Sequence, residues 1–312
     1  MLRYITGRLL QLIPVLFFVS VIVFGMIRLA PGDPALIMTG GHQTSPEVLD
    51  NIRQKYHLTE PVYKQYLYWA GDALRGNLGE SFKLKQSVTA LILERLPLTL
   101  QLVLMSAFFA LIVAVPIGIA SAVKKNTWVD YVISVATLAG VSSPVFLTGI
   151  LGMLVFSYML NILPAFGIGS GFFDNFKYLL LPSLALGFNM IALSSRITRS
   201  SMIEVLGTNY IRTAVAKGLP ERTVIFKHGL RNALVPVITV AGLQVGFLIV
   251  GSVLVEYTFG IGGLGSLIVN SVQQNDYPVV QGTILFLVTA FLIINLMVDI
   301  LYAVIDPRIR YR

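Results

Sequence analysis

The sequence contains no cysteine, which excludes disulfide bonds, thiolate metal sites and cysteine nucleophiles. Histidine is nearly as scarce, and no two of His42, His57 and His228 have the i, i+4 spacing of a helical metal site. Charged residues make up only 12% of the 312 residues, about half the share of an ordinary soluble domain. There is also no GxxxxGK[ST] motif, so the chain carries no P-loop of its own. These absences argue against an enzyme, and the 55% share of hydrophobic residues favours a membrane protein.

Six long apolar runs predict an all-α protein with six transmembrane helices. Their approximate ranges are 9–29, 98–122, 131–160, 178–197, 234–255 and 280–304. Each has about the 20 residues that a helix needs to cross a hydrocarbon core roughly 30 Å thick. The third run is long enough to be tilted, or to include an interfacial piece near Pro144. The fourth is interrupted by Pro182, Gly187 and Asn189.

The distribution of lysine and arginine predicts the orientation of these helices. With both termini in the cytoplasm, the cytoplasmic segments hold 14 basic and four acidic residues, and the external segments hold nine basic and ten acidic residues. This asymmetry follows the positive-inside rule. The net charge of +8 is therefore a signal of topology and not of nucleic-acid binding. The first run lacks a small-residue cleavage site, so we interpret it as an uncleaved span.

The segment between the first two runs is too long for a simple connection. We therefore divide the chain into 1–30, the N-terminus and first span; 31–96, an external helical insertion; and 97–312, a five-span core with a cytoplasmic loop at about 198–233. The insertion is either a structural lid over the span ends or a surface that receives a partner.

Two helices are predicted in the insertion. The first starts within 44–47, because Thr44 and Glu47 have the spacing of a capping box. Leu49, Ile52 and Tyr56 then lie on one face. The second helix runs from Pro61 to Leu74, and the residues on one of its sides are Tyr63, Leu67, Ala70 and Leu74.

The polar segment 208–236 predicts a short amphipathic helix between two spans. Its apolar residues Ile211, Ala214, Val215 and Leu219 follow the spacing i, i+3, i+4 and i+8. Thr208 or Asn209 can cap its start, and Gly218 suits the left-handed residue that ends a helix. An apolar face at this place docks either on lipid headgroups or in the groove of a soluble partner. We favour a partner that supplies energy to the chain.

Two glycine patterns have simple interpretations. Gly242 and Gly246 have GxxxG spacing, which favours close helix packing in a membrane. The loop 260–265 matches GxGxxG, but it follows a membrane span and does not join a strand to a helix. A dinucleotide site is therefore rejected there in favour of flexible backbone at a gate or span junction.

Polar residues near or inside the spans are candidates for substrate contacts. Asn189, Gln244 and Asp299 are possible residues of the translocation path, with interhelical hydrogen bonds or a salt bridge as the alternative. Glu256 and Asp276 border the external mouth, where they would meet a cationic amine or a binding protein. Solvated loop charges are the simpler interpretation of these two acids.

Several sequence motifs together resemble one family, the dipeptide/oligopeptide/nickel permeases of ABC importers. The motifs are PGDP at 31–34, NYIRTAVAKG at 209–218, LRNALVP at 230–236, DYPVVQ at 276–281 and NLMVD at 295–299. Their order along the whole chain is similar to that of the first of the two membrane subunits.

The resemblance implies a type I importer permease fold and several partners. These are a second homologous permease subunit, two ATPase subunits and a soluble or lipid-anchored substrate-binding protein, at a bacterial or archaeal plasma membrane. No cofactor is expected in this chain, because ATP and Mg belong to the ATPase subunits. The substrates of the family are dipeptides, oligopeptides, glutathione and chelated nickel.

The resemblance also identifies 208–236 with the loop that couples to the ATPase. The coupling residues that it implies are Tyr210, Ile211, Arg212, Ala214, Val215, Lys217, Gly218 and Leu219. Arg212 stands where the general importer pattern has glutamate, and we expect Arg212 to make the polar contact there.

A secondary transporter driven by an ion gradient is the alternative function. Such a protein would show internal repeats and carboxylates at the membrane midplane. The sequence shows no internal repeat and offers only Asp299 as such a carboxylate.

Overall fold

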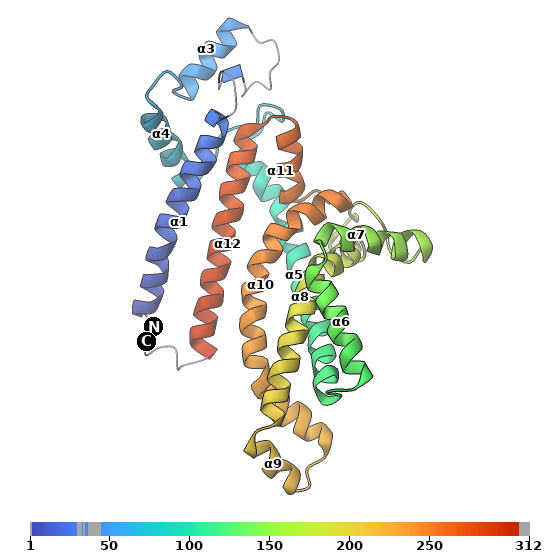
Figure 1. Ribbon diagram of the computed structural model, residues 1–312. Coiled ribbons are helices and arrows are strands. Elements are labelled where there is room, and N and C mark those ends of the chain that lie inside the picture. The colour runs from blue at the N-terminus through green and yellow to red at the C-terminus, as the bar shows by residue number, and fades with distance from the viewer. Residues whose placement is uncertain (1, 30–32, 34, 37–44, 306–312) are drawn as a thin grey trace. The chain divides into compact units, whose positions relative to one another are not determined.

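The computed structural model describes residues 2–29, 33, 35–36 and 45–305 (Figure 1). The regular structure of these residues is helical, apart from one β-bridge between Glu80 and Ser87. Two compact units are present, Met1–Thr99 with Gly262–Leu296, and Leu100–Ile261 with Met297–Arg312. Helices α5 (Val88–Val123) and α12 (Tyr277–Ile305) run through both units.

The first unit contains α1 (Leu2–Leu29), α3 (Pro46–Lys55), α4 (Val62–Leu74) and α11 (Leu264–Gln273), with the adjoining parts of α5 and α12. Both helices predicted in the insertion are present. Ser45 is the N-cap of α3, and its side chain forms no capping hydrogen bond. Thr44 and the PGDP residues other than Asp33 lie outside the described residues.

The core of the first unit joins segments that are far apart in the sequence. The buried residues of this core are Val88, Leu91, Ile92, Leu264, Leu267 and Val279. A smaller cluster contains Ala35 and Ile52, against which Leu49 and Tyr56 pack as the spacing of α3 predicts. Helix α4 differs, because Tyr63, Leu67 and Leu74 are exposed.

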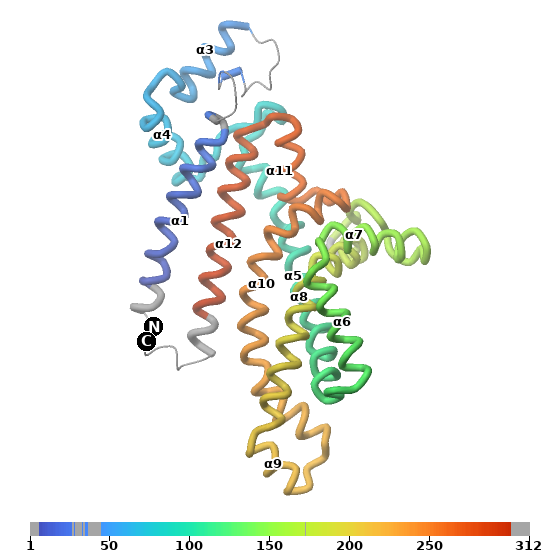
Figure 2. Tube along the Cα trace, viewed as in Figure 1, coloured from blue at the N-terminus to red at the C-terminus, as the bar shows by residue number. Residues whose placement is uncertain are grey.

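The second unit contains α6 (Trp128–Ser142), α7 (Val145–Gly152), the π-helix η1 (Met153–Met159), α8 (Phe172–Leu206) and α9 (Asn209–Ala216). The π-helix η2 (Thr223–Gly229) and α10 (Leu230–Phe259) follow. The chain turns by 113° between Ser142 and Val145 (Figure 2), where Pro144 precedes α7. A proline cannot donate the backbone hydrogen bond that would continue the helix.

Five helices are long and apolar enough to cross a membrane, and the bent pair of α6 with α7 and η1 makes six if it counts as one span. The six-span prediction agrees with this number. The helices extend beyond the apolar runs, since α5 begins at Val88 and α8 ends at Leu206. An apolar run marks only the part of a helix that lies in the hydrocarbon core. The hydrogen-bonded helix continues beyond it into polar surroundings.

Glycines allow the helices of the second unit to approach one another closely. A Cβ atom on Gly187 would lie 2.9 Å from the carbonyl oxygen of Ser106, so α8 contacts α5 at this glycine. A Cβ atom on Gly242 would lie 2.6 Å from the Val298 side chain, so α10 packs against α12 there. This packing agrees with the prediction from the GxxxG spacing, and Gly187 does not interrupt α8.

A buried carboxylate ties three segments of the second unit together. The Asp130 side chain is 3% exposed and accepts two hydrogen bonds of 2.7 Å from Nε and Nη2 of Arg199 in α8. It also accepts bonds from the Ser121 hydroxyl and from the backbone N–H of Asn126. Paired donors from arginine make a strong and directional contact. The turn between α5 and α6 is therefore fixed to the last third of α8.

We expect Asp130→Asn and Arg199→Gln each to destabilise the chain by about 2 kcal/mol, because each leaves a desolvated partner without its counter-charge. The double variant should cost less than the sum of the two, since its second substitution has no ion pair left to break. Thermal unfolding of the purified chain in nanodiscs measures these effects. Glu204→Gln, an exposed acid on the same helix, is the control. Strictly additive effects would contradict the coupling.

Candidate functional site

Helix α9 lies at the ends of α8 and α10, which it joins (Figures 1 and 2). Thr208 is its N-cap residue, with extended backbone angles and no side-chain bond to the helix N–H groups. The Thr208 hydroxyl instead donates to the carbonyl of Val205, in the last turn of α8 (2.6 Å). The polar segment predicted from the sequence is thus a separate short helix that starts directly after a span.

The inner face of α9 packs on the elements from which it emerges. Ile211 and Ala214 are buried in a cluster with Val224 of η2. Val205 and Leu206, at the end of α8, pack against this cluster. This contact buries apolar surface of α9 and of the elements that it packs against. Helix α9 is therefore part of the second unit and not a loosely attached loop.

The C-terminus of α9 is a Schellman motif. Lys217 is the C-cap, and Gly218 follows it with φ of +75°. The N–H of Gly218 donates to the carbonyl of Val215 (2.9 Å), and that of Leu219 donates to the carbonyl of Ala214 (3.3 Å). These two bonds define the motif, and its left-handed residue is usually glycine. The sequence-based prediction for Gly218 is confirmed.

The outer surface of α9 is exposed. Its exposed residues among the predicted coupling residues are Tyr210, Arg212, Val215, Lys217, Gly218 and Leu219. Val215 is 59% exposed although its spacing placed it with Ile211 and Ala214, so the predicted apolar face is split into an inner and an outer part. An apolar side chain at this outer surface is available to a partner.

Tyr210 connects α9 to α10 by a polar contact that the sequence did not reveal. Its hydroxyl accepts a hydrogen bond from the side-chain amide of Asn232 (2.7 Å). Asn232 lies in the first turn of α10, beyond the π-helix η2. Because α9 ends at Ala216 and a turn separates it from η2 and α10, helical spacing does not relate Asn232 to Tyr210.

The three residues predicted for the translocation path lie in the second unit on different helices. With its amide oriented to satisfy its neighbours, Asn189 of α8 donates to the carbonyls of Gly140 (2.8 Å) and Val141 (3.1 Å) at the end of α6. Gln244 of α10 and Asp299 of α12 are both half-buried. The contact of Asn189 is the interhelical hydrogen bonding that the sequence left as the alternative. The path assignment stays a prediction for all three residues.

Solvated loop charges are the wrong interpretation of Glu256 and Asp276. Glu256 is fully buried in the last turns of α10. Asp276 is 2% exposed and accepts hydrogen bonds from the Ser81 hydroxyl and from the N–H groups of Phe82 and Lys83. These bonds tie the turn before α5 to the start of α12 within the first unit, which is a structural use of the carboxylate.

The loop 260–265 is also more ordered than flexible backbone would be. Gly260 ends α10 in the left-handed conformation, with φ of +65°. Ile261 and Leu264 are fully buried, and α11 begins at Leu264. Helix α11 has Leu264, Leu267 and Ser271 buried on one face at spacings of three and four, a signal of an amphipathic helix that the glycine motif obscured. Across the part of the chain that the structure describes, no three histidine, aspartate or glutamate side chains form a metal-binding group.

Two family models match the chain and together cover nearly all of it. Residues 114–311 match the inner membrane component of binding-protein-dependent transport systems. Residues 1–103 match the N-terminal part of the membrane components of the same systems.

Individual relatives agree with these models. The glutathione transport system permease protein GsiC of Escherichia coli strain K12 is 43% identical over 312 residues, 100% of both chains. GsiC of Shigella dysenteriae serotype 1 gives the same values. Among solved structures, an inward-facing form of the MetNI methionine ABC transporter is similar in fold, with a TM-score of 0.56 and 17% identity. The similarity covers 69% of this chain and 96% of the other. The chain therefore belongs to the binding-protein-dependent transport system inner membrane components and is a multi-pass permease subunit of a bacterial ABC importer.

Proposed function

We propose that this permease serves an importer of short peptides of the glutathione class, with α9 as the element that docks on an ATPase subunit. The outer surface of α9 carries the docking part of the proposal. The substrate class is supported by the 43% identity to GsiC over the full length of both chains. Chelated nickel and longer peptides, which the family resemblance also implies, have no comparable support.

The partners in this proposal supply what the chain lacks. Two ATPase subunits bind ATP and Mg, a second homologous permease completes the path, and a binding protein delivers the substrate. A cofactor bound to this chain is not part of the proposal. Both termini lie in the cytoplasm, in keeping with the excess of basic residues in the segments on that side.

Docking at α9 would transmit force because the helix is held on both sides. Its inner face packs against residues of α8 and η2, and Tyr210 is bonded to Asn232 of α10. A displacement of α9 by closing ATPase subunits must therefore move the ends of two spans. Such coupling needs contacts that differ between the states of the ATPase. Arg212 and Val215 are the exposed residues that we assign to these contacts.

Reconstitution in proteoliposomes tests the proposed function directly. The chain, its second permease, its two ATPases and its binding protein should together accumulate radiolabelled glutathione when ATP is supplied. Omission of the ATPases should abolish uptake even with a proton or sodium gradient imposed. Gradient-driven uptake by this chain alone would instead establish the secondary transporter.

Gly218→Val should impair both transport and the stimulation of the ATPase by the binding protein. Nothing lies within 4 Å of a Cβ atom at this position, so the substitution costs backbone strain and not space. A left-handed conformation costs an L-residue roughly 1–2 kcal/mol, and a β-branched residue more. We expect a large loss of binding-protein-stimulated ATPase activity in the assembled importer. Gly218→Asn, which tolerates this conformation, is the matched control and should retain most of the activity. Equal activity of the two variants would contradict the role of the Schellman motif.

Val215→Asp should weaken docking without destabilising the permease. The side chain is exposed, so its replacement should change the free energy of unfolding by no more than about 0.5 kcal/mol. Docking would desolvate the new carboxylate against an apolar groove of the ATPase subunit. We therefore expect the permease to bind the ATPase subunits about tenfold more weakly. Co-purification and titration of the ATPase subunits measure this loss. Val48→Asp, an exposed valine of the insertion, is the control, and unchanged affinity of both variants would argue against docking at α9.

A further inference from the structure

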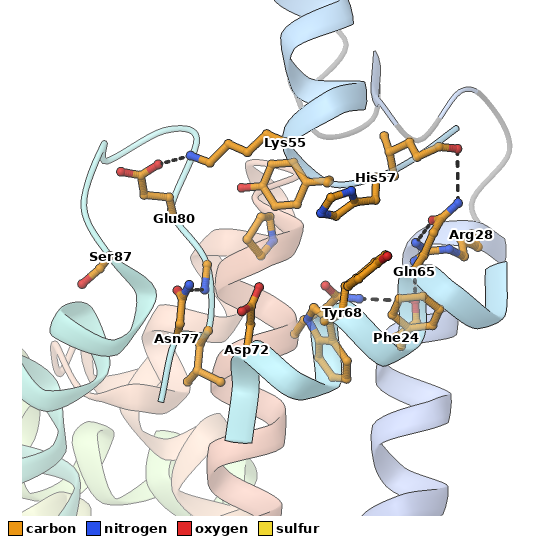
Figure 3. Close-up of a pocket in the computed structure, with 17 residues that line it drawn as sticks. Phe24, Arg28, Lys55, His57, Gln65, Tyr68, Asp72, Asn77, Glu80 and Ser87 are labelled. Atoms are coloured by element: carbon orange, nitrogen blue, oxygen red, sulfur yellow. Dashed lines mark hydrogen bonds and ion pairs between the residues drawn. The ribbon is translucent and has the colours of Figure 1, made fainter. Parts of the chain in front are cut away.

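The first unit contains a cavity that has no role in docking at α9. Its volume is about 360 Å³, within the range of roughly 300–1,000 Å³ typical of small-molecule sites. Six segments form its walls: the end of α1, the end of α3 with the turn after it, one face of α4, the loop 77–80, Ser87 before α5 and the start of α12 (Figure 3). Polar and aromatic side chains dominate the lining.

The walls of the cavity are held by internal hydrogen bonds. The amide nitrogen of Gln65 donates to the carbonyls of Leu58 (3.2 Å) and Glu60 (2.7 Å). Gln281 of α12 donates to the carbonyl of Val23 in α1 (2.8 Å). The Gln65 bonds fix α4 to the turn before it, and the Gln281 bond fixes α12 to α1.

His57 and Tyr68 form an aromatic wall. Their ring centroids are 4.4 Å apart, with an angle of 32° between the rings. His57 has φ of +52° because it follows the C-cap Tyr56 of α3 in a Schellman motif. Its N–H donates to the carbonyl of Gln54 (3.2 Å), and the N–H of Leu58 donates to the carbonyl of Arg53 (2.8 Å). The end of α3 thus places the imidazole in the cavity wall.

Two opposite charges face the cavity without a charged partner in the described part of the chain. Arg28 lies over the Phe24 ring at 3.6 Å and donates to the Phe24 carbonyl and to Gln65. A guanidinium has five N–H donors, so others remain for a ligand. Asp72 is exposed, and its carboxylate forms no ion pair or hydrogen bond with any described residue. Figure 3 shows Asp72 and Arg28 on opposite sides of Tyr68 in that view.

The other charged pair of the lining is already neutralised. Lys55 and Glu80 form a salt bridge of 2.6 Å at the cavity. Their hydrogen bond raises the pKa of Lys55 and lowers the pKa of Glu80, so both groups stay charged and compensate each other. Arg28 and Asp72 therefore determine which charges a ligand must carry.

The spacing of these two charges defines the length of a ligand. Gln65, to which Arg28 is bonded, and Asp72 are seven residues apart on one face of α4, or about 10 Å along the helix axis. Three extended peptide residues also span about 10 Å.

We propose that this cavity binds a short zwitterionic peptide of about three residues, with its carboxylate at Arg28 and its ammonium group at Asp72. The rings of Tyr68 and Trp69 lie between the two ends and add contact area and cation–π attraction for the ammonium group. This inference rests on the proposed peptide specificity and adds a substrate subsite on the permease itself.

Tryptophan fluorescence provides the test, because Trp69 lines the cavity and Trp128 is the other of only two tryptophans. The full-length Trp128→Phe chain in nanodiscs is titrated with trialanine, N-acetyl-trialanine and trialanine amide. We expect a saturable change of Trp69 fluorescence with trialanine. Each blocked peptide should bind about fivefold more weakly, since it loses one charge-assisted contact at a partly exposed site.

The Asp72→Asn variant should bind trialanine about fivefold more weakly. It should bind trialanine and N-acetyl-trialanine with equal affinity. It should still bind trialanine more tightly than trialanine amide, because Arg28 is unchanged. Glu47→Gln, which removes an exposed acid of the insertion outside the cavity, should change neither the affinity for trialanine nor its difference from the N-acetyl form. A missing fluorescence change, equal binding of the three peptides, or an unaltered Asp72→Asn variant would overturn the proposal. If Asp72→Asn weakened binding of the binding protein but not of trialanine, Asp72 would belong to a protein contact and the proposal would also be overturned.

Transport separates this inference from the proposed function. If the reconstituted importer accumulates peptide while Trp69 does not respond, the subsite is wrong and the proposed function stands. If Trp69 responds as expected but no peptide is transported, the cavity binds peptides and the proposed substrate class is wrong.

Discussion

The burial of Ile211 and Ala214 against α8 and η2 is the interaction on which the proposed docking function of α9 depends. In the proposed function, separate ATPase subunits supply the energy, and it reaches the spans through the surface of α9. If α9 were attached only through its backbone, movement of the ATPase subunits would rotate α9 without moving the spans. The apolar cluster, the Schellman motif and the bond between Tyr210 and Asn232 instead attach α9 at its inner face, its end and its side.

Sequence reasoning predicted the type and order of the long helices, because the bilayer requires long apolar segments with internally bonded backbone. It was less successful with boundaries and with short elements. The 113° bend after α6 is signalled by Pro144, but its size depends on how α7 packs against the other helices of the second unit. Helix α11 was missed because its glycine-rich start suggested flexibility, whereas its leucines belong to the core of the first unit.

The candidate site was predictable where one local rule decides the conformation. Gly218 was predicted correctly because the left-handed C-cap is a property of the chain itself. Val215 was assigned to the wrong side because an eight-residue helix meets partners on only part of its predicted face. The bond of Asn232 to Tyr210 was not predictable from spacing, since the two residues lie in separate helices with a turn after α9.

The acidic residues at the ends of spans show why position along the sequence is a poor guide to solvation. Asp130 and Asp276 both stand beside apolar runs, where a loop charge is expected, and yet they are 2% exposed as whole residues. Each accepts hydrogen bonds from a neighbouring turn, and Asp130 adds the guanidinium of a distant helix. A buried carboxylate deprived of its donors is strongly destabilising. The first unit contains the network of Asp276 and the second that of Asp130, so in each unit a buried carboxylate fixes a turn to a helix.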